Sequence, residues 1–327
     1  MKILFTIVIT LLFISNSNTI AQDLDEKDIN QLKFRHIGPI GNRVTCVSGI
    51  TNDPLTYYVG AAAGGVWKTT DGGLNWNPIF DDQEVHSIGA IAVSPSEPMT
   101  IYVGTGESSI RSNVSIGNGI YKSEDGGDTW KYIGLKNSGR ISRIIIHPNN
   151  SDLVYVGALG HSYSPQKERG LFMSEDGGNS WKHTLYIDDN TGISDIVMDP
   201  NNSRVLFAGA WQLDLKTWRR VSGGPGSGLF KSIDGGASWN KLKDNGLPKK
   251  DVGKIALAMT PAAPDRVYAL IETGDGVPYN GEETESGELW RSEDNGKTFK
   301  LINSDRELGS RQAYYTRTTA SPDNANE

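Results

Sequence analysis

The sequence has little cysteine, no excess of positive charge and no long apolar run, and each absence excludes a class of protein. A single cysteine, Cys46, leaves no Cys-x-x-Cys motif and no metal-type Cys/His spacing. The net charge of −7 argues against nucleic acid as a partner, because a phosphate-binding surface needs excess lysine and arginine. The apolar run 3–14 is shorter than the roughly 20 residues that span a bilayer. We therefore expect no nucleic acid, no membrane span, no metal and no cofactor.

The first residues nevertheless have the pattern of an export signal. Lys2 precedes the apolar run, and Thr19 and Ala21 supply small side chains at the −3 and −1 positions of a signal peptidase site. Residues 1–21 therefore predict a signal peptide cut after Ala21, and a secreted or periplasmic protein. Cys46 lies in a strand-like run and is expected to be a small buried apolar group.

Glycine is abundant, with 38 residues, and much of it falls in a repeated octapeptide. The pattern S/T-x-D-x-G-x-x-aromatic occurs five times at a spacing of about 50 to 60 residues, which is typical of repeat architectures. We call each copy the octapeptide. The copies are residues 69–76, 123–130, 174–181, 232–239 and 292–299, with the aspartates Asp71, Asp125, Asp176, Asp234 and Asp294.

Each position of the octapeptide has a physical task in a hairpin turn. The aspartate and the Ser/Thr hydroxyl are expected to hydrogen-bond the turn backbone. The second glycine is expected to take a positive φ. The closing aromatic is expected to bury its ring in the sheet that carries the hairpin and so anchor that hairpin. We therefore assign these aspartates a structural role rather than a catalytic one.

A second element recurs upstream of each octapeptide: two β-branched runs joined by a turn with proline, asparagine or aspartate, as in 141–157. Each unit then reads as four antiparallel strands, which is a propeller blade. We predict an all-β fold, a β-propeller of five blades over residues 22–327. Residues 315–322 are expected to open a sixth unit, so that the remaining blades belong to a longer chain.

These repeats resemble the bacterial neuraminidase repeat, or Asp-box. The runs FRHIGPIGNRV (34–44), GAAAGGVWKTTDGG (60–73) and GGPGSGLFKSIDGG (223–236) are similar to the exported bacterial branch of the sortilin-type propeller superfamily, often labelled glycosyl hydrolase. The resemblance implies a propeller. It does not imply one function, because the motif recurs in sialidases, xyloglucanases, sorting receptors and photosystem assembly factors.

Function is expected on the face that carries the loops between second and third strands, opposite the octapeptides. Those loops hold carboxylates, arginines and aromatic rings suited to gripping a sugar or a peptide. The candidate ligand-binding residues are Glu107, Arg111, His161, Tyr163, Trp211, Trp218, Arg219, Arg220 and Tyr279. The alternative for Trp211 and Trp218 is a structural role covering the top of the blade.

No catalytic residue is assigned. Xyloglucanase-type propellers carry an essential aspartate in a first-blade run similar to TDIGG, and the resemblance places Ala62 at that position. The Arg-Ile-Pro element of sialidases is absent, although Arg43, Arg140 and Arg143 are candidates to line a central channel.

The sequence thus favours a non-catalytic exported scaffold that binds a peptide, a protein or a glycan. The alternative is a glycoside hydrolase with part of its site in further blades. A third hypothesis is an assembly factor for an envelope complex. A glycosidase would need two carboxylates about 5 to 10 Å apart across one pocket, whereas a binding module would present aromatic rings and arginines without such a pair.

Overall fold

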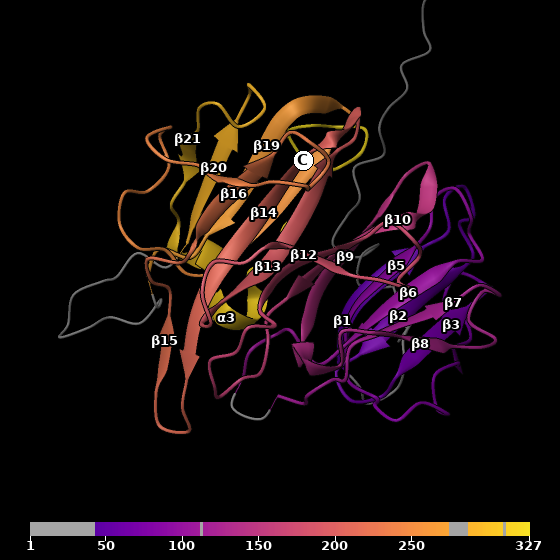
Figure 1. Cartoon of the computed structure of the whole chain (residues 1–327). Helices are drawn as coiled ribbons and strands as arrows, with labels where there is room; N and C mark the ends of the chain where they lie inside the picture. The colour runs from indigo at the N-terminus through magenta and orange to yellow at the C-terminus, as the bar shows by residue number, and fades with distance from the viewer. Residues whose placement is uncertain (1–42, 112–113, 275–286, 310–311) are drawn as a thin grey trace, which may run out of the picture. The chain divides into compact units, whose positions relative to one another are not determined.

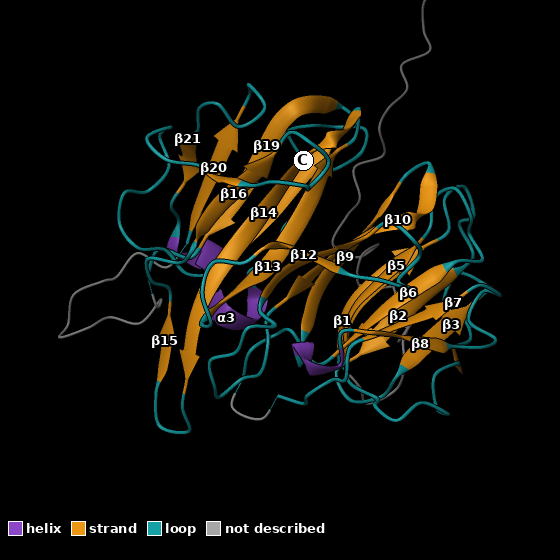
Figure 2. Cartoon of the chain, in the orientation of Figure 1, coloured by secondary structure: helices purple, strands orange, loops and turns teal. Residues whose placement is uncertain are grey.

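The computed structural model describes residues 43–111, 114–274, 287–309 and 312–327 (Figure 1). The expected signal peptide and Tyr279 lie outside the described residues. Strands dominate the described part (Figure 2). None of the helices described in it is long and apolar enough to cross a membrane.

The described strands form five antiparallel sheets, one per repeat, which confirms the expected blades. Blade one contains β1 (Val44–Gly49), β2 (Tyr57–Ala61), β3 (Val66–Thr69) and β4 (Asn77–Pro78). Blade two contains β5 (Ile88–Val93), β6 (Ile101–Thr105), β7 (Ile120–Ser123) and β8 (Lys131–Gly134). Blade three contains β9 (Ile141–His147), β10 (Asn150–Ala158), β11 (Gly170–Ser174) and β12 (Lys182–Leu185).

Blade four has an extra strand. It contains β13 (Thr191–Asp199), β14 (Asn202–Leu215), β16 (Gly228–Ser232) and β17 (Asn240–Lys241), and β15 (Arg220–Ser222) pairs with the end of β14. Blade five contains β18 (Ile255–Thr260), β19 (Ala263–Ile271), β20 (Glu288–Ser292) and β21 (Lys300–Asn303). The short helices are η1 (Lys136–Ser138), η2 (Arg306–Gly309) and α3 (Gln312–Tyr315).

The first strands of successive blades contact one another in the order β1, β5, β9, β13 and β18, so they are the innermost strands. Both faces of most inner strands are covered, which explains why their apolar runs are continuous rather than alternating. Four hydrophobic cores lie between neighbouring blades. The core between blades two and three, for example, joins Tyr102 and Ile120 to Ile144 and Val156. Burial of apolar side chains between blades therefore stabilises the packing of each blade against the next.

Hydroxyl groups on the inner strands also join neighbouring blades. The Thr45 hydroxyl contacts the carbonyl of Gly60 in its own blade and the carbonyl of Ile88 in the next blade, at 2.9 and 2.7 Å. Ser194 repeats this arrangement with Gly209 and Ile255. A carbonyl facing the next blade would otherwise be buried without a donor, so the hydroxyl compensates for its lost hydration.

Each octapeptide forms a turn held by its own polar groups. In blade four the Ser232 hydroxyl donates to Asp234 Oδ1 at 2.7 Å, and the Gly236 N–H donates to Ser232 Oγ at 2.8 Å. Asp234 also accepts from the backbone and hydroxyl of Ser238. These hydrogen bonds, those from Ser238 first, lower the pKa of Asp234 to about 2. The other four turns repeat the pattern.

The backbone of the turn is more demanding than expected. Both the position before the second glycine and the second glycine itself take positive φ, as in Gly235 (75°) and Gly236 (81°). Asn295 occupies the first of these positions in blade five with φ 56°, which asparagine tolerates better than most residues.

Two of the closing aromatics, Trp130 and Trp181, do not behave as expected. The indole N–H of Trp130 donates to the Ile79 carbonyl at 2.7 Å, and that of Trp181 to the Ile133 carbonyl at 2.9 Å. Each acceptor belongs to the preceding blade. The expected anchoring within a single hairpin is therefore wrong for these two residues, because the ring fills the seam between blades. Cys46 is half-buried on β1 rather than fully buried.

The segment that was expected to open a sixth unit does not form a strand among the described residues. Residues 312–315 form α3, and the chain then continues without regular structure to residue 327. This tail contacts blade five at both ends of β18: the Lys254 ammonium donates to the Ala313 carbonyl at 3.4 Å, and the Thr260 hydroxyl to the Ser321 carbonyl at 2.6 Å. The start of the tail also contacts the long loop of blade two, where the Ile110 N–H donates to the Ala313 carbonyl at 3.3 Å.

Candidate functional site

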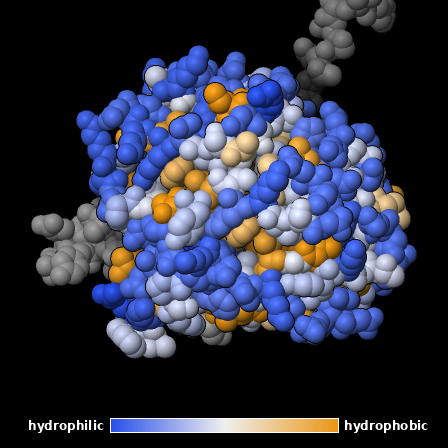
Figure 3. Space-filling view, in the orientation of Figure 1, coloured by the Kyte–Doolittle hydropathy of each residue, from blue (hydrophilic) through white to orange (hydrophobic). Residues whose placement is uncertain are grey.

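The long loops leave the ends of the second strands, β6, β10, β14 and β19, and lead to the third strands. The octapeptides and the proline turns join the other strand ends, so the long loops share the opposite face. The surface is largely hydrophilic with scattered apolar patches on the side seen in Figure 3.

The most distinctive feature of this face is a hairpin formed by the end of β14 and β15 (Figure 1). The pairing runs through Leu213 and Ser222, and the Lys216 N–H donates to the Arg219 carbonyl at 2.7 Å to close the turn. Trp218 lies in that turn and is 82% exposed. A large aromatic ring so exposed at a hairpin tip is available to a ligand.

A pocket of about 290 Å³ lies beside the hairpin. The residues lining it come from the long loops of blades two, three and four and from α3. They are Ile110, Arg111, Tyr163, Leu215, Lys216, Thr217, Trp218, Arg219, Arg220 and Tyr314. Aromatic rings and cationic donors therefore converge, and none of these lining residues carries a carboxylate. We call this the loop-face pocket.

Arg111 is held in the wall of the loop-face pocket by Glu107. Its Nε lies 2.7 Å from Glu107 Oε1 and its Nη2 lies 2.8 Å from Oε2, a two-pronged ion pair. Glu107 itself is fully buried. The hydrogen bonds that Arg111 donates to the Glu107 carboxylate raise the pKa of Arg111, so the arginine remains a fixed cation.

A buried polar network fixes the base of the hairpin. The Trp211 indole N–H donates to Ser222 Oγ at 3.0 Å, and the Ser222 hydroxyl donates to Glu272 Oε2 at 2.6 Å. The same oxygen accepts a hydrogen bond from the backbone N–H of Lys254 at 2.8 Å. Blade five thus positions the hairpin of blade four through one carboxylate.

The side chains of this network have perturbed titration. Burial raises the pKa of Glu272, against the lowering effect of its hydrogen bonds. Burial, aided by the charge of Arg317, lowers the pKa of Lys254 to about 7. The Lys254 ammonium also lies 5.6 Å from the centre of the Trp211 ring, a cation–π contact.

The arginines expected to line a channel are distributed differently. Arg143 on β9 contacts Asp195 on β13 at 3.4 Å and is 43% exposed, so it reaches open space beside the inner strands. Arg140 is fully buried and donates to the carbonyls of Gly160 and His161, which makes it a clamp on the loop of blade three. Arg140 and Arg143 thus have different surroundings, one buried beneath a loop and the other open to solvent.

Ala62, at the position where the resemblance expects an essential aspartate, is 1% exposed. Its N–H donates to the Arg43 carbonyl at 2.8 Å. Among the described residues no group of three or more His, Cys, Asp or Glu side chains could hold a metal ion.

The sequence candidates fall into three groups. Five of them line the loop-face pocket: Arg111, Tyr163, Trp218, Arg219 and Arg220. Glu107 lies behind Arg111, and the His161 carbonyl accepts from the buried arginines. Trp211 is fully buried, so it cannot offer its ring to a ligand, and its structural alternative describes it better.

Sequence reasoning missed Ser222, Lys254 and Tyr314. Ser222 and Lys254 hold the base of the hairpin, while Tyr314 approaches the pocket from α3. A lysine directly before an inner strand, in a run that is otherwise apolar, is the one signal that could have drawn attention to Lys254.

Comparisons with known proteins support the fold and bear on the function. No family model matches the chain. A xyloglucanase from Paenibacillus sp. is 26% identical over 265 residues, which cover 72% of this chain and 23% of that enzyme. The photosystem II assembly lipoprotein Ycf48 of Synechococcus sp. (strain CC9902) is 26% identical over 206 residues, which cover 56% of this chain and 57% of that protein.

A solved structure of an ancestral GH74 enzyme has a TM-score of 0.58 with 19% identity, and the match covers 80% of this chain and 31% of that one. This likeness supports the propeller fold. The chain spans about a quarter of the length of the xyloglucanases that it matches. The main functional prediction from sequence, a non-catalytic scaffold, is contradicted by the xyloglucanase relatives, which are named as enzymes. The alternative, a glycoside hydrolase, agrees with them better.

Proposed function

We propose that this protein is an exported glycoside hydrolase that acts on a xyloglucan-type polysaccharide, with the loop-face pocket as a sugar-binding subsite. The observation that carries the proposal is the similarity to xyloglucanases over most of the chain, combined with an aromatic and cationic pocket on the long-loop face. The glycan is thus the partner that we take forward from the sequence predictions. The octapeptides are, in this proposal, Asp-boxes of the sortilin-type superfamily that serve the scaffold.

The chemistry of the loop-face pocket suits a neutral sugar chain. Sugar rings present an apolar face with axial C–H groups, and an exposed indole such as Trp218 supplies a flat apolar partner for it. Hydroxyl groups at the ring edge accept hydrogen bonds from guanidinium groups such as Arg111, whose orientation Glu107 fixes.

The catalytic carboxylates belong outside this pocket. Glycoside hydrolysis uses an acid and a base or nucleophile, both usually carboxyl groups. None of the residues lining the loop-face pocket has one, and Ala62 stands where the family resemblance expects one. The proposal therefore assigns substrate binding to this pocket and seeks the catalytic pair elsewhere in the full-length protein.

The test is hydrolysis by the purified full-length protein. Xyloglucan, cellulose and mixed-linkage β-glucan are incubated separately, and new reducing ends are measured with time. We expect release from xyloglucan above the other two substrates. Absence of new reducing ends from all three polysaccharides would rule out the proposed activity.

A further inference from the structure

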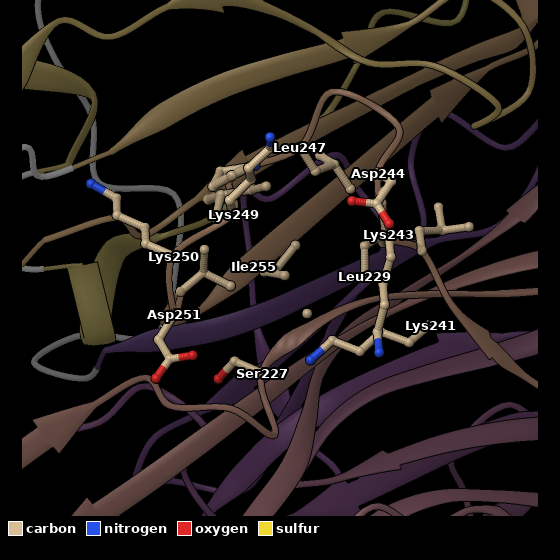
Figure 4. A pocket seen from close by; sticks show the side chains of 15 residues that line it. Ser227, Leu229, Lys241, Lys243, Asp244, Leu247, Lys249, Lys250, Asp251 and Ile255 are labelled. Carbon is tan, nitrogen blue, oxygen red and sulfur yellow. The ribbon is translucent and has the colours of Figure 1, made fainter.

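A second pocket, of about 330 Å³, lies in the seam between blades four and five (Figure 4). We call it the seam pocket. It is formed by β16, β17 and the connection from β17 to β18, with Ile255 from β18 and Ile271 from β19. Its fifteen lining residues are Ser227, Gly228, Leu229, Lys241, Leu242, Lys243, Asp244, Leu247, Pro248, Lys249, Lys250, Asp251, Val252, Ile255 and Ile271.

The floor of the seam pocket is aliphatic. Leu229, Ile255 and Ile271 are at most 2% exposed and form the hydrophobic core beneath it, whereas Leu242 and Leu247 are only half-buried and supply its accessible apolar surface. Leu242 and Leu247 pack against the same core. None of the fifteen lining residues, all within the described part of the chain, is aromatic. The seam pocket therefore lacks the flat rings of the loop-face pocket and is suited to an alkyl chain rather than a sugar.

The rim of the seam pocket is positively charged. Four lysines and two aspartates line it, which gives a local charge of 4 − 2 = +2, whereas the whole chain carries −7. A local excess of this sign on an acidic protein favours an anionic ligand.

Lys241 is a fixed part of this rim. Its ammonium donates to the Pro225 carbonyl at 2.8 Å and lies 6.0 Å from the centre of the Phe230 ring. Its stem runs against the backbone of Gly228, where a Cβ atom would meet Lys241 Cε at 2.5 Å. Burial lowers the pKa of Lys241, and a ligand carboxylate would stabilise its charged form.

The wall formed by residues 242–251 is tied to blade five. The Phe299 N–H donates to the Asn245 carbonyl at 2.7 Å, and Gly246, with φ 96°, lies so close to Phe299 that a Cβ would meet its carbonyl oxygen at 2.2 Å. The seam pocket is thus bounded by a loop whose path is set by backbone contacts rather than by its exposed lysines.

We propose that the seam pocket binds a medium-chain aliphatic carboxylate, with the alkyl chain against Leu242 and Leu247 and the carboxylate among Lys241, Lys243 and Lys249. The volume lies at the lower end of the range for small-molecule sites, about 300 to 1,000 Å³, which suits one unbranched chain. This site is separate from the loop-face pocket and needs no glycoside hydrolase activity.

The test is calorimetric titration of the purified full-length protein with decanoate. Decanol has the same alkyl chain without the charge, and acetate has the charge without the chain. We expect saturable binding of decanoate, at least about tenfold weaker binding of decanol, no measurable binding of acetate, and a decanoate affinity that falls with added salt. Lack of saturable decanoate binding, or equal affinity for decanol, would overturn the proposal.

Matched variants locate the site. The triple variant K241Q/K243Q/K249Q removes three rim charges, and the control K131Q/K182Q/K300Q removes three exposed lysines at the starts of outer strands of blades two, three and five. Both have the same net charge. We expect the rim variant to lose at least about tenfold in decanoate affinity and the control less than about twofold. Equal loss in the two would mean non-specific attraction and would refute a site in the seam, and thermal unfolding of both variants checks that each is folded.

Discussion

The indole N–H of Trp181 donates to the carbonyl of Ile133 across the seam between blades three and two, at 2.9 Å. The residue that closes an octapeptide therefore stabilises the contact between repeats rather than only its own turn. Because every blade depends on its neighbours for burial, seam contacts of this kind contribute to the cooperativity of the propeller.

Replacing Trp181 by phenylalanine keeps most of the apolar ring but removes the donor. We expect the free energy of unfolding to fall by about 1 to 2 kcal/mol, since a hydrogen bond contributes about 1 kcal/mol and its orphaned carbonyl adds a desolvation cost. Urea unfolding followed by circular dichroism measures the change. The matched control is W218F at the exposed hairpin tip, which should stay within about 0.5 kcal/mol; equal effects in both variants would contradict a seam role.

The two glycines of one octapeptide separate backbone strain from steric clash. Gly235 has φ 75° and a Cβ there would be 4.0 Å from the nearest atom, Tyr155 Oη, whereas Gly236 has φ 81° and a Cβ there would lie 2.7 Å from Tyr155. We expect G235A to cost about 1 kcal/mol from the positive φ alone. G236A should cost a further 1 to 3 kcal/mol or so, because the tyrosine of the preceding blade must move. Similar unfolding free energies for the two variants would disprove this contact.

Arg111 and Glu107 should be strongly coupled. Removing the arginine in R111A leaves the Glu107 carboxylate buried without its partner, so we expect a loss of about 3 to 5 kcal/mol in unfolding free energy. The double variant E107Q/R111A should recover part of that loss, since the charge is then absent. A double-mutant cycle with the single variants measures the coupling. Additive effects would show that the pair contributes little.

We expect the free energy of unfolding to depend on pH through the titration of Lys254. Its folded pKa, about 7, lies below the unfolded value of about 10.4, so between those values the unfolded state binds more protons than the folded state. Stability from this group therefore increases as the pH rises from about 7 to about 10. The variant K254M should flatten this slope in the unfolding free energy measured across that range, while K131M at an exposed position should keep it. An unchanged slope in K254M would exclude Lys254 as its source.

Trp218 should matter for substrate and not for folding. If the loop-face pocket binds sugar, W218A should weaken binding of xyloglucan oligosaccharides by about tenfold or more, as truncation of an aromatic anchor commonly costs above 1 kcal/mol. Val221, on the same hairpin and 42% exposed, does not line the pocket, so V221A serves as control. Affinity electrophoresis in xyloglucan gels compares them. Equal mobility shifts for W218A and V221A would show that the ring of Trp218 does not form the sugar site.

Much of the fold could be read from the spacing of residues. Five octapeptides at blade spacing, each preceded by β-branched strand pairs, predicted the blades, because strand length and turn chemistry are local properties. Glycine at a turn that needs positive φ is equally local. The assignment of ligand candidates to long loops also needed only the order of strands, and five of those candidates line one pocket.

Contacts between repeats were not readable in the same way. Trp211 and Trp218 occupy one loop in the sequence, yet one is fully buried and the other is 82% exposed. The difference arises from β15, whose pairing with β14 turns Trp211, Leu213 and Leu215 inward and places Trp218 at the tip. Likewise, residues 315–322 have strand composition but form no strand in the described part, since a strand needs a partner that composition cannot supply.

The sequence by itself therefore determined the repeat, the turn chemistry and the number of described blades, all of which depend on residues close in the chain. Tertiary structure alone decided which tryptophans reach solvent, that octapeptide tryptophans bridge neighbouring blades, that Glu272 and Lys254 hold the hairpin base, and that lysines surround an aliphatic seam. These features depend on packing between units about 50 residues apart, where side-chain burial is set by the neighbouring blade and not by the local pattern.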